Sequence, residues 1–222
     1  MAPTKLELFY DVVSPYSYLA AVVLERYTRT PSPLWPLELV WRPAFLAGVF
    51  KAVGNTPPAS LPQRASYLLQ DIARLSRFFD VDMTVPETFP GDTLRAMRLL
   101  SAAALTQPAR VGALSMALWR RHWGKGREVA SDDALLWATR EAGLDDGAAV
   151  VARTSDAEVK DALRRATDEA VARGAFGFPA TFVTLDGEDA LFFGSDRLEL
   201  LAHTLGLPWR GPRPSTTAGA AT

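Results

Sequence analysis

Hydrophobic and polar positions change their spacing along the chain, and these changes separate a short α/β opening from a long helical block and a closing α/β segment. Residues 5–13 are largely apolar and β-branched, which is typical of a strand, and helical spacing follows over residues 16–29. A second strand is expected at residues 37–42, where Pro43 ends the run. The opening therefore predicts a β-α-β unit.

Beyond Pro62 the apolar positions keep helical periodicity for about a hundred residues. The expected helices lie at residues 62–79, 91–105, 108–123, 131–143 and 155–173. Strand character returns at 179–184 and 189–193 on either side of Asp186-Gly187, a pair that favours a hairpin. A last helix is expected to follow Asp196 and to run to residue 205, with Asp196 and Glu199 in capping-box spacing.

This order of elements predicts an α/β sheet that is interrupted by an all-helical insertion. On this division residues 1–60 and 174–210 form a discontinuous α/β domain, and residues 61–173 form the helical insertion domain. Residues 211–222, rich in Gly, Pro, Ser and Thr, are expected to be a flexible tail.

Composition and charge narrow the classes of partner. The 222 residues include 24 Lys plus Arg and 25 Asp plus Glu, which gives a net charge of −1 without a basic block. Nucleic acid and anionic membrane surfaces are therefore not expected as partners. No apolar run approaches the roughly 18 residues of a transmembrane helix, and no cleavable targeting peptide is expected.

The chain has no cysteine. This excludes a disulfide, a thiolate metal site and a protein thiol nucleophile, so any sulfur chemistry must use the sulfur of a ligand. His122 and His203 are the two histidines, too few for a histidine-rich metal site, and no metal is expected.

Ser14 and Pro15 stand where the first strand gives way to the first helix. Serine is a favoured N-cap and proline a favoured first helical residue. A helix N-terminus also stabilises an anion such as a thiolate, and the Ser14 hydroxyl can donate a further hydrogen bond to it. The plain alternative is that Ser14 only caps the helix.

Two further motifs flank the closing strands. If Pro179 is cis, the backbone of Phe178 is free to pair with a peptide-like ligand, although an ordinary strand-initiating proline is the alternative. The N–H groups of Ser195 and Asp196 can hold a carboxylate, and the Asp196 side chain can accept from an ammonium group. An amino-acid head group satisfies both, and plain capping by Asp196 is the alternative.

Taken together, the element order resembles a thioredoxin fold with a DsbA-like helical insertion. The segment Ser-Pro-Tyr-Ser falls where redox members of that fold carry Cys-Pro-x-Cys, and the absence of both cysteines excludes disulfide exchange. From about Lys5 to Pro214 the chain resembles the kappa class of glutathione transferases, in the segments FYDVVSPYSYLA, RPAFLAGVFKAVGNTPP, GAFGFPATF and FGSDRLELLAHTLG.

The resemblance implies that glutathione, as co-substrate, supplies the missing thiol, with its sulfur beside Ser14. Ser14 would be the catalytic residue and would stabilise the thiolate by hydrogen bonding without becoming a covalent nucleophile. Pro15 and Tyr16 would line the same turn. Phe178, next to Pro179, would make the antiparallel backbone contact to the cysteinyl part of glutathione.

The same resemblance implies contacts to the two ends of glutathione. Ser195 and Asp196 would hold the γ-glutamyl end, and Asn55 would meet the glycyl carboxylate. Arg64 and Asp71, at the start of the helical insertion, would add contacts that lie partly across a dimer interface. Arg64 stands where the family usually has a lysine.

Kappa enzymes conjugate glutathione to electrophiles such as aryl halides, can reduce organic hydroperoxides, and form homodimers in mitochondria or peroxisomes. The same activity and detoxification role are thus expected here, with a small-molecule electrophile as second substrate. The last residues, Ala220-Ala221-Thr222, lack a Ser-Lys-Leu type of peroxisomal signal, which weakens the peroxisomal expectation, and the cytoplasm is a further alternative.

Two alternatives remain. Bacterial 2-hydroxychromene-2-carboxylate isomerases share the fold, the serine, the use of glutathione and the YLLQD pattern. The transferase interpretation rests mainly on the kappa-like form of residues 194–197 and on GAFGFPATF. A noncatalytic thioredoxin-like binding module is the third interpretation, which a lack of glutathione affinity would favour.

Overall fold

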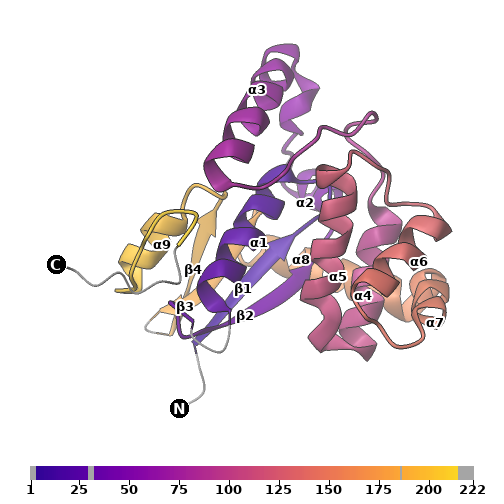
Figure 1. Ribbon diagram of the computed structural model, residues 1–222. Helices are drawn as coiled ribbons and strands as arrows, with labels where there is room; N and C mark the ends of the chain where they lie inside the picture. Colours follow the sequence, from indigo (N-terminus) through magenta and orange to yellow (C-terminus); the bar gives the residue numbers. More distant parts are fainter. Residues whose placement is uncertain (1–3, 30–32, 186, 215–222) are drawn as a thin grey trace.

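A mixed four-stranded sheet forms the centre of the computed structural model, which describes residues 4–29, 33–185 and 187–214 (Figure 1). In the order β2-β1-β3-β4 across the sheet, the strands are β2 (Leu37–Pro43), β1 (Thr4–Tyr10), β3 (Ala180–Leu185) and β4 (Glu188–Phe193). β1 is parallel to β2, whereas β3 is antiparallel to both of its neighbours. Helix α1 (Pro15–Thr28) connects the parallel pair, as the opening pattern predicts.

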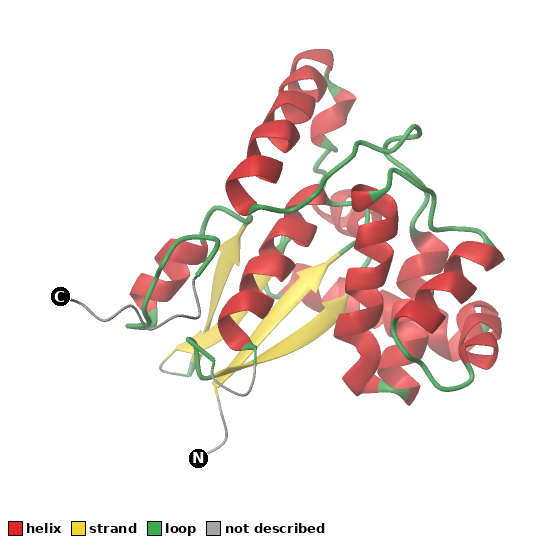
Figure 2. Cartoon of the chain, viewed as in Figure 1, coloured by secondary structure: helices red, strands yellow, loops and turns green. Residues whose placement is uncertain are grey.

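A block of helices separates β2 from β3 in the sequence (Figure 2), and its residues enter the cores on both faces of the sheet. After α2 (Leu46–Val53), its helices are α3 (Pro62–Phe79), α4 (Leu94–Thr106), α5 (Val111–Trp119), α6 (Asp132–Glu141), α7 (Gly147–Ala152) and α8 (Ala157–Ala172). Helix α9 (Leu198–Thr204) follows the last strand. The expected α/β sheet with an all-helical insertion is confirmed, and the domain boundaries stay a prediction.

The two faces of the sheet bury different sets of side chains, because successive residues of a strand point to opposite faces. Leu6, Leu8 and Tyr10 of β1 are fully buried in the larger core, together with residues of α1, α9 and the helical block. Phe9 and Phe182 belong to a second core on the other face, with residues of α2 and α8. The sheet therefore holds the opening, the insertion and the closing segment together.

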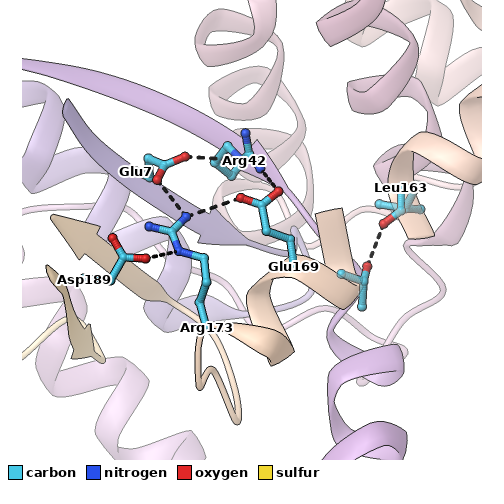
Figure 3. Close-up of polar contacts among 7 residues, drawn as sticks. Glu7, Arg42, Leu163, Glu169, Arg173 and Asp189 are labelled. Atoms are coloured by element: carbon cyan, nitrogen blue, oxygen red, sulfur yellow. Dashed lines mark hydrogen bonds and ion pairs between the residues drawn. The ribbon is translucent and has the colours of Figure 1, made fainter. Parts of the chain in front are cut away.

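A network of charged side chains fastens the end of α8 to this second face of the sheet (Figure 3). Its members come from β1, β2, α8 and β4 and are Glu7, Arg42, Glu169, Arg173 and Asp189. Arg173 is central: its guanidinium donates to Glu7 and Asp189 at 2.7 Å each and lies 4.2 Å from the centre of the Phe182 ring. The network orients the chain as it leaves the helical block for β3.

Helix α3 projects beyond the other helices (Figure 1). One side of it is buried, through Leu68 and Ile72, while Tyr67, Leu69 and Phe78 are exposed large hydrophobic residues. The helix therefore carries large apolar side chains both on its buried side and on the side that faces solvent.

Several elements differ from the sequence prediction. β1 ends at Tyr10 rather than at residue 13, because the Asp11 carboxylate accepts a hydrogen bond from the Val13 N–H and turns the backbone. Helix α2 lies in a region for which the sequence analysis expected no element, and α7 was likewise not expected. The helix expected at 108–123 is divided into a short 3₁₀ turn, α5 and a π-helical turn at residues 120–124.

The C-terminal part of the described chain lies against α1. The carbonyl of Gly211 accepts a hydrogen bond from the Tyr27 hydroxyl, and the carbonyl of Pro212 accepts one from Arg26. The remainder of the expected tail, residues 215–222, and the hairpin residue Asp186 lie outside the described residues. Within those residues no helix is long and apolar enough to cross a membrane.

Candidate active site

Ser14 is the N-cap of α1, as predicted, with Pro15 as the first residue of the helix. Its Oγ accepts a hydrogen bond from the Ser17 N–H at 3.1 Å, the usual capping contact. The same Oγ donates to the carbonyl oxygen of Phe178 at 3.2 Å. Ser14 thus does more than cap the helix, because its hydroxyl also links α1 to the segment that enters β3.

The Phe178–Pro179 peptide bond is cis, and β3 begins at the next residue. Phe178 is 5% exposed, and its carbonyl points to Ser14. The preceding Gly177 lies close to Phe193, since a Cβ atom on it would stand 3.1 Å from the Phe193 ring. Of the two alternatives for Pro179 the cis geometry is the one found, and the Phe178 carbonyl contacts the N-terminus of α1.

A cavity of about 1390 Å³ opens at this junction. All of the site residues predicted from the sequence line it, namely Ser14, Pro15, Tyr16, Asn55, Arg64, Asp71, Phe178, Pro179, Ser195 and Asp196. They come from segments as far apart as α1, α3 and the β4–α9 connection, so the fold brings together residues that the sequence separates.

Tyr16 and Asp71 form the wall of the cavity between α1 and α3. The Tyr16 hydroxyl donates to the Asp71 carboxylate at 3.0 Å. Burial and this hydrogen bond both raise the pKa of the Tyr16 hydroxyl well above its usual value, so it stays protonated at neutral pH. Arg64 lies about two turns before Asp71 on α3 and is exposed to solvent where it lines the cavity.

Asn55 follows Gly54, which ends α2 in the left-handed conformation at φ 69°. Its Nδ2 donates to the carbonyl of Phe176 at 2.8 Å, and its Oδ1 accepts from the Thr56 N–H at 2.8 Å. The Asn55 amide therefore holds the loop after α2 against the segment that precedes β3.

Ser195 and Asp196 lie in the turn between β4 and α9. Ser195 is buried, whereas the Asp196 side chain is 70% exposed and lies 3.3 Å from Arg197. The expected capping by Asp196 is wrong: α9 begins at Leu198, its N-cap is Arg197, and no side chain caps it. The chain turns at Gly194, with φ 97°, the helix starts one residue later than expected, and Asp196 lines the cavity.

Comparison with known proteins places the chain in a family. The sequence profile of the DSBA-like thioredoxin domain family matches residues 5–206. The chain is 42% identical to glutathione S-transferase kappa 1 of Rattus norvegicus over 222 residues, which cover 97% of this chain and 96% of the relative. The chain belongs to the kappa glutathione transferases of the DsbA-like thioredoxin family.

A more distant relative carries the name of the alternative activity. The 2-hydroxychromene-2-carboxylate isomerase of Sphingobium xenophagum is 27% identical over 202 residues, 90% of this chain and 97% of the relative. A solved structure of a 2-hydroxychromene-2-carboxylate isomerase superposes with a TM-score of 0.78 at 22% identity, covering 91% of this chain and 94% of that one. The superposition supports the thioredoxin-like fold of this kappa chain.

Asp11 also lines the cavity, although no motif in the sequence marks it. It is fully buried and lines the cavity three residues before Ser14. Burial raises the pKa of its carboxyl group, and hydrogen bonds from Val13, Leu46 and Thr93 oppose this effect. The signal in the sequence is a single acidic residue between two apolar runs.

The cavity of this kappa chain also has an apolar part that the sequence analysis did not locate. Aromatic side chains from α3, from the loop before α4 and from the segment after α9 line it, namely Phe78, Phe79, Phe89 and Trp209. Within the described residues no three His, Asp or Glu side chains gather as ligands for a metal ion.

Proposed function

We propose that this kappa-family chain binds glutathione in the cavity at the N-terminus of α1 and transfers it to electrophiles. The observation that carries the proposal is the buried Ser14 hydroxyl, placed between the first turn of α1 and the cis Phe178–Pro179 bond in a chain without cysteine. A site of this kind can stabilise a thiolate but must obtain it from a ligand.

Three features favour the thiolate over the thiol. Pro15 has no N–H, so Tyr16 carries the first backbone N–H of α1, at the N-terminus where the helix presents its positive partial charge. The Ser14 hydroxyl adds a donor when it turns from the Phe178 carbonyl toward the sulfur. Tyr16 remains protonated and does not compete as an anion.

With an aryl halide as the electrophile, the sulfur attacks the carbon that bears the halogen. A carbon–sulfur bond forms, the carbon–halogen bond breaks, and halide leaves with the electron pair. The thiol proton passes to solvent when the thiolate forms. In this reaction the residues of the chain bind and orient glutathione and hold its charge, and Ser14 does not become covalently modified.

The rest of glutathione is proposed to extend across the cavity. Its cysteinyl part pairs with the backbone of Phe178, and its γ-glutamyl end meets Ser195 and Asp196, whose exposed carboxylate suits an ammonium group. Asn55 and Arg64 also line the cavity and are proposed to meet the glycyl carboxylate.

We further propose a homodimer formed through α3. The exposed hydrophobic residues Tyr67, Leu69 and Phe78 on this projecting helix favour burial against a second copy, and Arg64 and Asp71 lie on the same helix. Reduction of organic hydroperoxides, which uses the same thiolate, and a mitochondrial or peroxisomal location are proposed from the resemblance to the kappa class alone.

Isomerisation of 2-hydroxychromene-2-carboxylate is the second candidate function. The relative of 27% identity favours it. An isomerase adds glutathione to its substrate and eliminates it again, so glutathione is not consumed, whereas a transferase consumes it.

Calorimetric titration of the purified chain with glutathione and with S-hexylglutathione tests the proposal. We expect both to bind saturably, and S-hexylglutathione to bind more tightly because its alkyl chain enters the aromatic part of the cavity. Consumption of glutathione with an aryl halide then supports the transferase, and turnover of 2-hydroxychromene-2-carboxylate without consumption supports the isomerase. No binding at millimolar glutathione refutes both and favours a noncatalytic module.

A further inference from the structure

The Asp11 side chain bridges three separate segments of the cavity wall. Its Oδ1 accepts from the Val13 N–H at 3.0 Å and from the Thr93 hydroxyl at 2.8 Å, and its Oδ2 accepts from the Leu46 N–H at 2.9 Å. Val13, Leu46 and Thr93 all line the cavity. The main-chain carbonyl of Asp11 also accepts from the Ser14 N–H at 3.1 Å.

These partners lie at the ends of different elements. Val13 directly precedes Ser14, Leu46 is the first residue of α2, and Thr93 is the N-cap position of α4. Neither α2 nor α4 has a side-chain cap of its own. Asp11 therefore connects the turn that carries Ser14 to the starts of two helices that border the cavity.

We propose that Asp11 is a positioning residue of the active site, which fixes the Ser14 turn relative to the starts of α2 and α4 and so sets where the Ser14 hydroxyl meets the glutathione sulfur. The inference rests on the proposed use of glutathione. It assigns a role to a side chain that does not itself contact the sulfur.

A carboxylate is the side chain that suits this position. Two of the three donors are backbone N–H groups, which cannot reverse their direction, whereas the Thr93 hydroxyl can either donate or accept. An asparagine would present its NH₂ group to the N–H of either Val13 or Leu46. An apolar residue would leave both N–H groups buried without this acceptor.

The first test is Asp11→Asn, which keeps the size of the side chain but places an NH₂ group against one of the two backbone N–H groups. We expect kcat/KM for conjugation to fall on the order of 10²-fold, because displacement of a reacting group by about 1 Å has an effect of that size. The fall should lie mainly in kcat. The pKa of the thiol of bound glutathione should rise, an effect that loss of stability alone does not produce.

Thr93 provides a milder pair of variants. Thr93→Val removes one of the three hydrogen bonds and should lower kcat about fivefold, the value expected for a single hydrogen bond. Thr93→Ser keeps the hydroxyl and should restore the wild-type rate. If Asp11→Asn does not fold, this pair decides: equal rates for the valine and serine variants overturn the proposal.

Thr154→Val is the matched control. Thr154 is 3% exposed, its hydroxyl donates to the Val151 carbonyl at 2.8 Å, and it does not line the cavity. This variant removes a buried threonine hydroxyl as Thr93→Val does, and it should leave kcat unchanged. A fall in kcat as large as that of Thr93→Val contradicts a specific role for Asp11.

A double-mutant cycle with Ser14→Ala tests the route of the effect. If Asp11 acts through Ser14, then Asp11→Asn changes the pKa of the bound thiol in the wild type but adds little in the Ser14→Ala background. Additive shifts, or an unchanged pKa in folded Asp11→Asn, overturn the inference. Wild-type protein that binds no glutathione refutes the proposed function itself and the inference with it, so the two failures are distinguishable.

Discussion

Replacing Ser14 with alanine tests the two contacts that its hydroxyl makes, because each contact affects a different measurable property. In the wild type Oγ accepts from the Ser17 N–H and donates to the Phe178 carbonyl, and we propose that the same donor turns to the thiolate when glutathione is bound. Ser14→Ala removes both the acceptor and the donor. We therefore expect a small loss of stability and, independently, a rise in the pKa of the bound thiol.

The size of each effect follows from the contact that is lost. A hydrogen bond to a charged group contributes about 1.5–3 kcal/mol, and one pKa unit corresponds to about 1.4 kcal/mol, so the thiol pKa should rise by about 1–2 units. Loss of a helix cap costs about 1 kcal/mol, which for a chain of this length lowers the melting temperature by about 2–4 °C.

The assay is the ultraviolet absorbance of the thiolate, followed over a pH series with glutathione bound, together with a thermal melt. Ser131→Ala is the matched control, because Ser131 caps α6 by accepting from the Ala134 N–H at 3.2 Å and does not line the cavity. Both variants should melt earlier than the wild type. If Ser14→Ala leaves the thiol pKa where Ser131→Ala leaves it, Ser14 is only a cap and the proposed role is refuted.

Three further predictions concern other parts of the chain. Asp196→Ala should weaken glutathione binding, measured by calorimetry, about tenfold or more. The melting temperature should stay at the wild-type value because Asp196 does not cap α9. Unchanged affinity contradicts the proposed contact of Asp196 with the γ-glutamyl end. Arg173→Met should lower the free energy of unfolding, measured in urea, by about 2 kcal/mol, because Glu7 and Asp189 lose a charged hydrogen-bond donor. Arg173→Lys should recover only part of this loss. Equal stability of the methionine variant and the wild type refutes the prediction. Partial burial raises the pKa of Glu128, but hydrogen bonds from residues 131, 130 and 121 outweigh this and lower it to about 2 from a model-peptide value of 4.5. The ionised Glu128 carboxylate stabilises the fold above pH 4.5, and this stabilisation is lost as the pH falls toward 2. Glu128→Gln should therefore make the free energy of unfolding depend less on pH in that range. An unchanged pH dependence contradicts the prediction.

Local signals predicted the chain segments that meet at the cavity. Ser14 and Pro15 mark the start of α1 because an N-cap and the residue after it are chosen by contacts within one turn. The cis Pro179 follows a Gly-Phe pair directly before a strand, and the strands and longer helices follow from the period of their apolar positions. These features depend on residues near one another in the sequence.

Features that depend on distant contacts could not be predicted. The role of Asp11 requires Leu46 and Thr93, which stand 35 and 82 positions away. Asp196 has the sequence spacing of a cap, but the turn at Gly194 delays the helix. Helix α2 begins in an almost continuously apolar run, whose period does not separate a helix from a strand, and α7 has only 6 residues, too few for a period to show.

The contact between Ser14 and Phe178 spans 164 positions of the chain, and this has a consequence for biosynthesis. Translation delivers Ser14 and nearly all of the helices before the residue that completes the binding site exists. A nascent chain that stops before Phe178 has two of the four strands and lacks the carbonyl that the Ser14 hydroxyl contacts, so the proposed glutathione site is incomplete at that stage. A ligand that needs both segments stabilises only chains in which the last strands have been added.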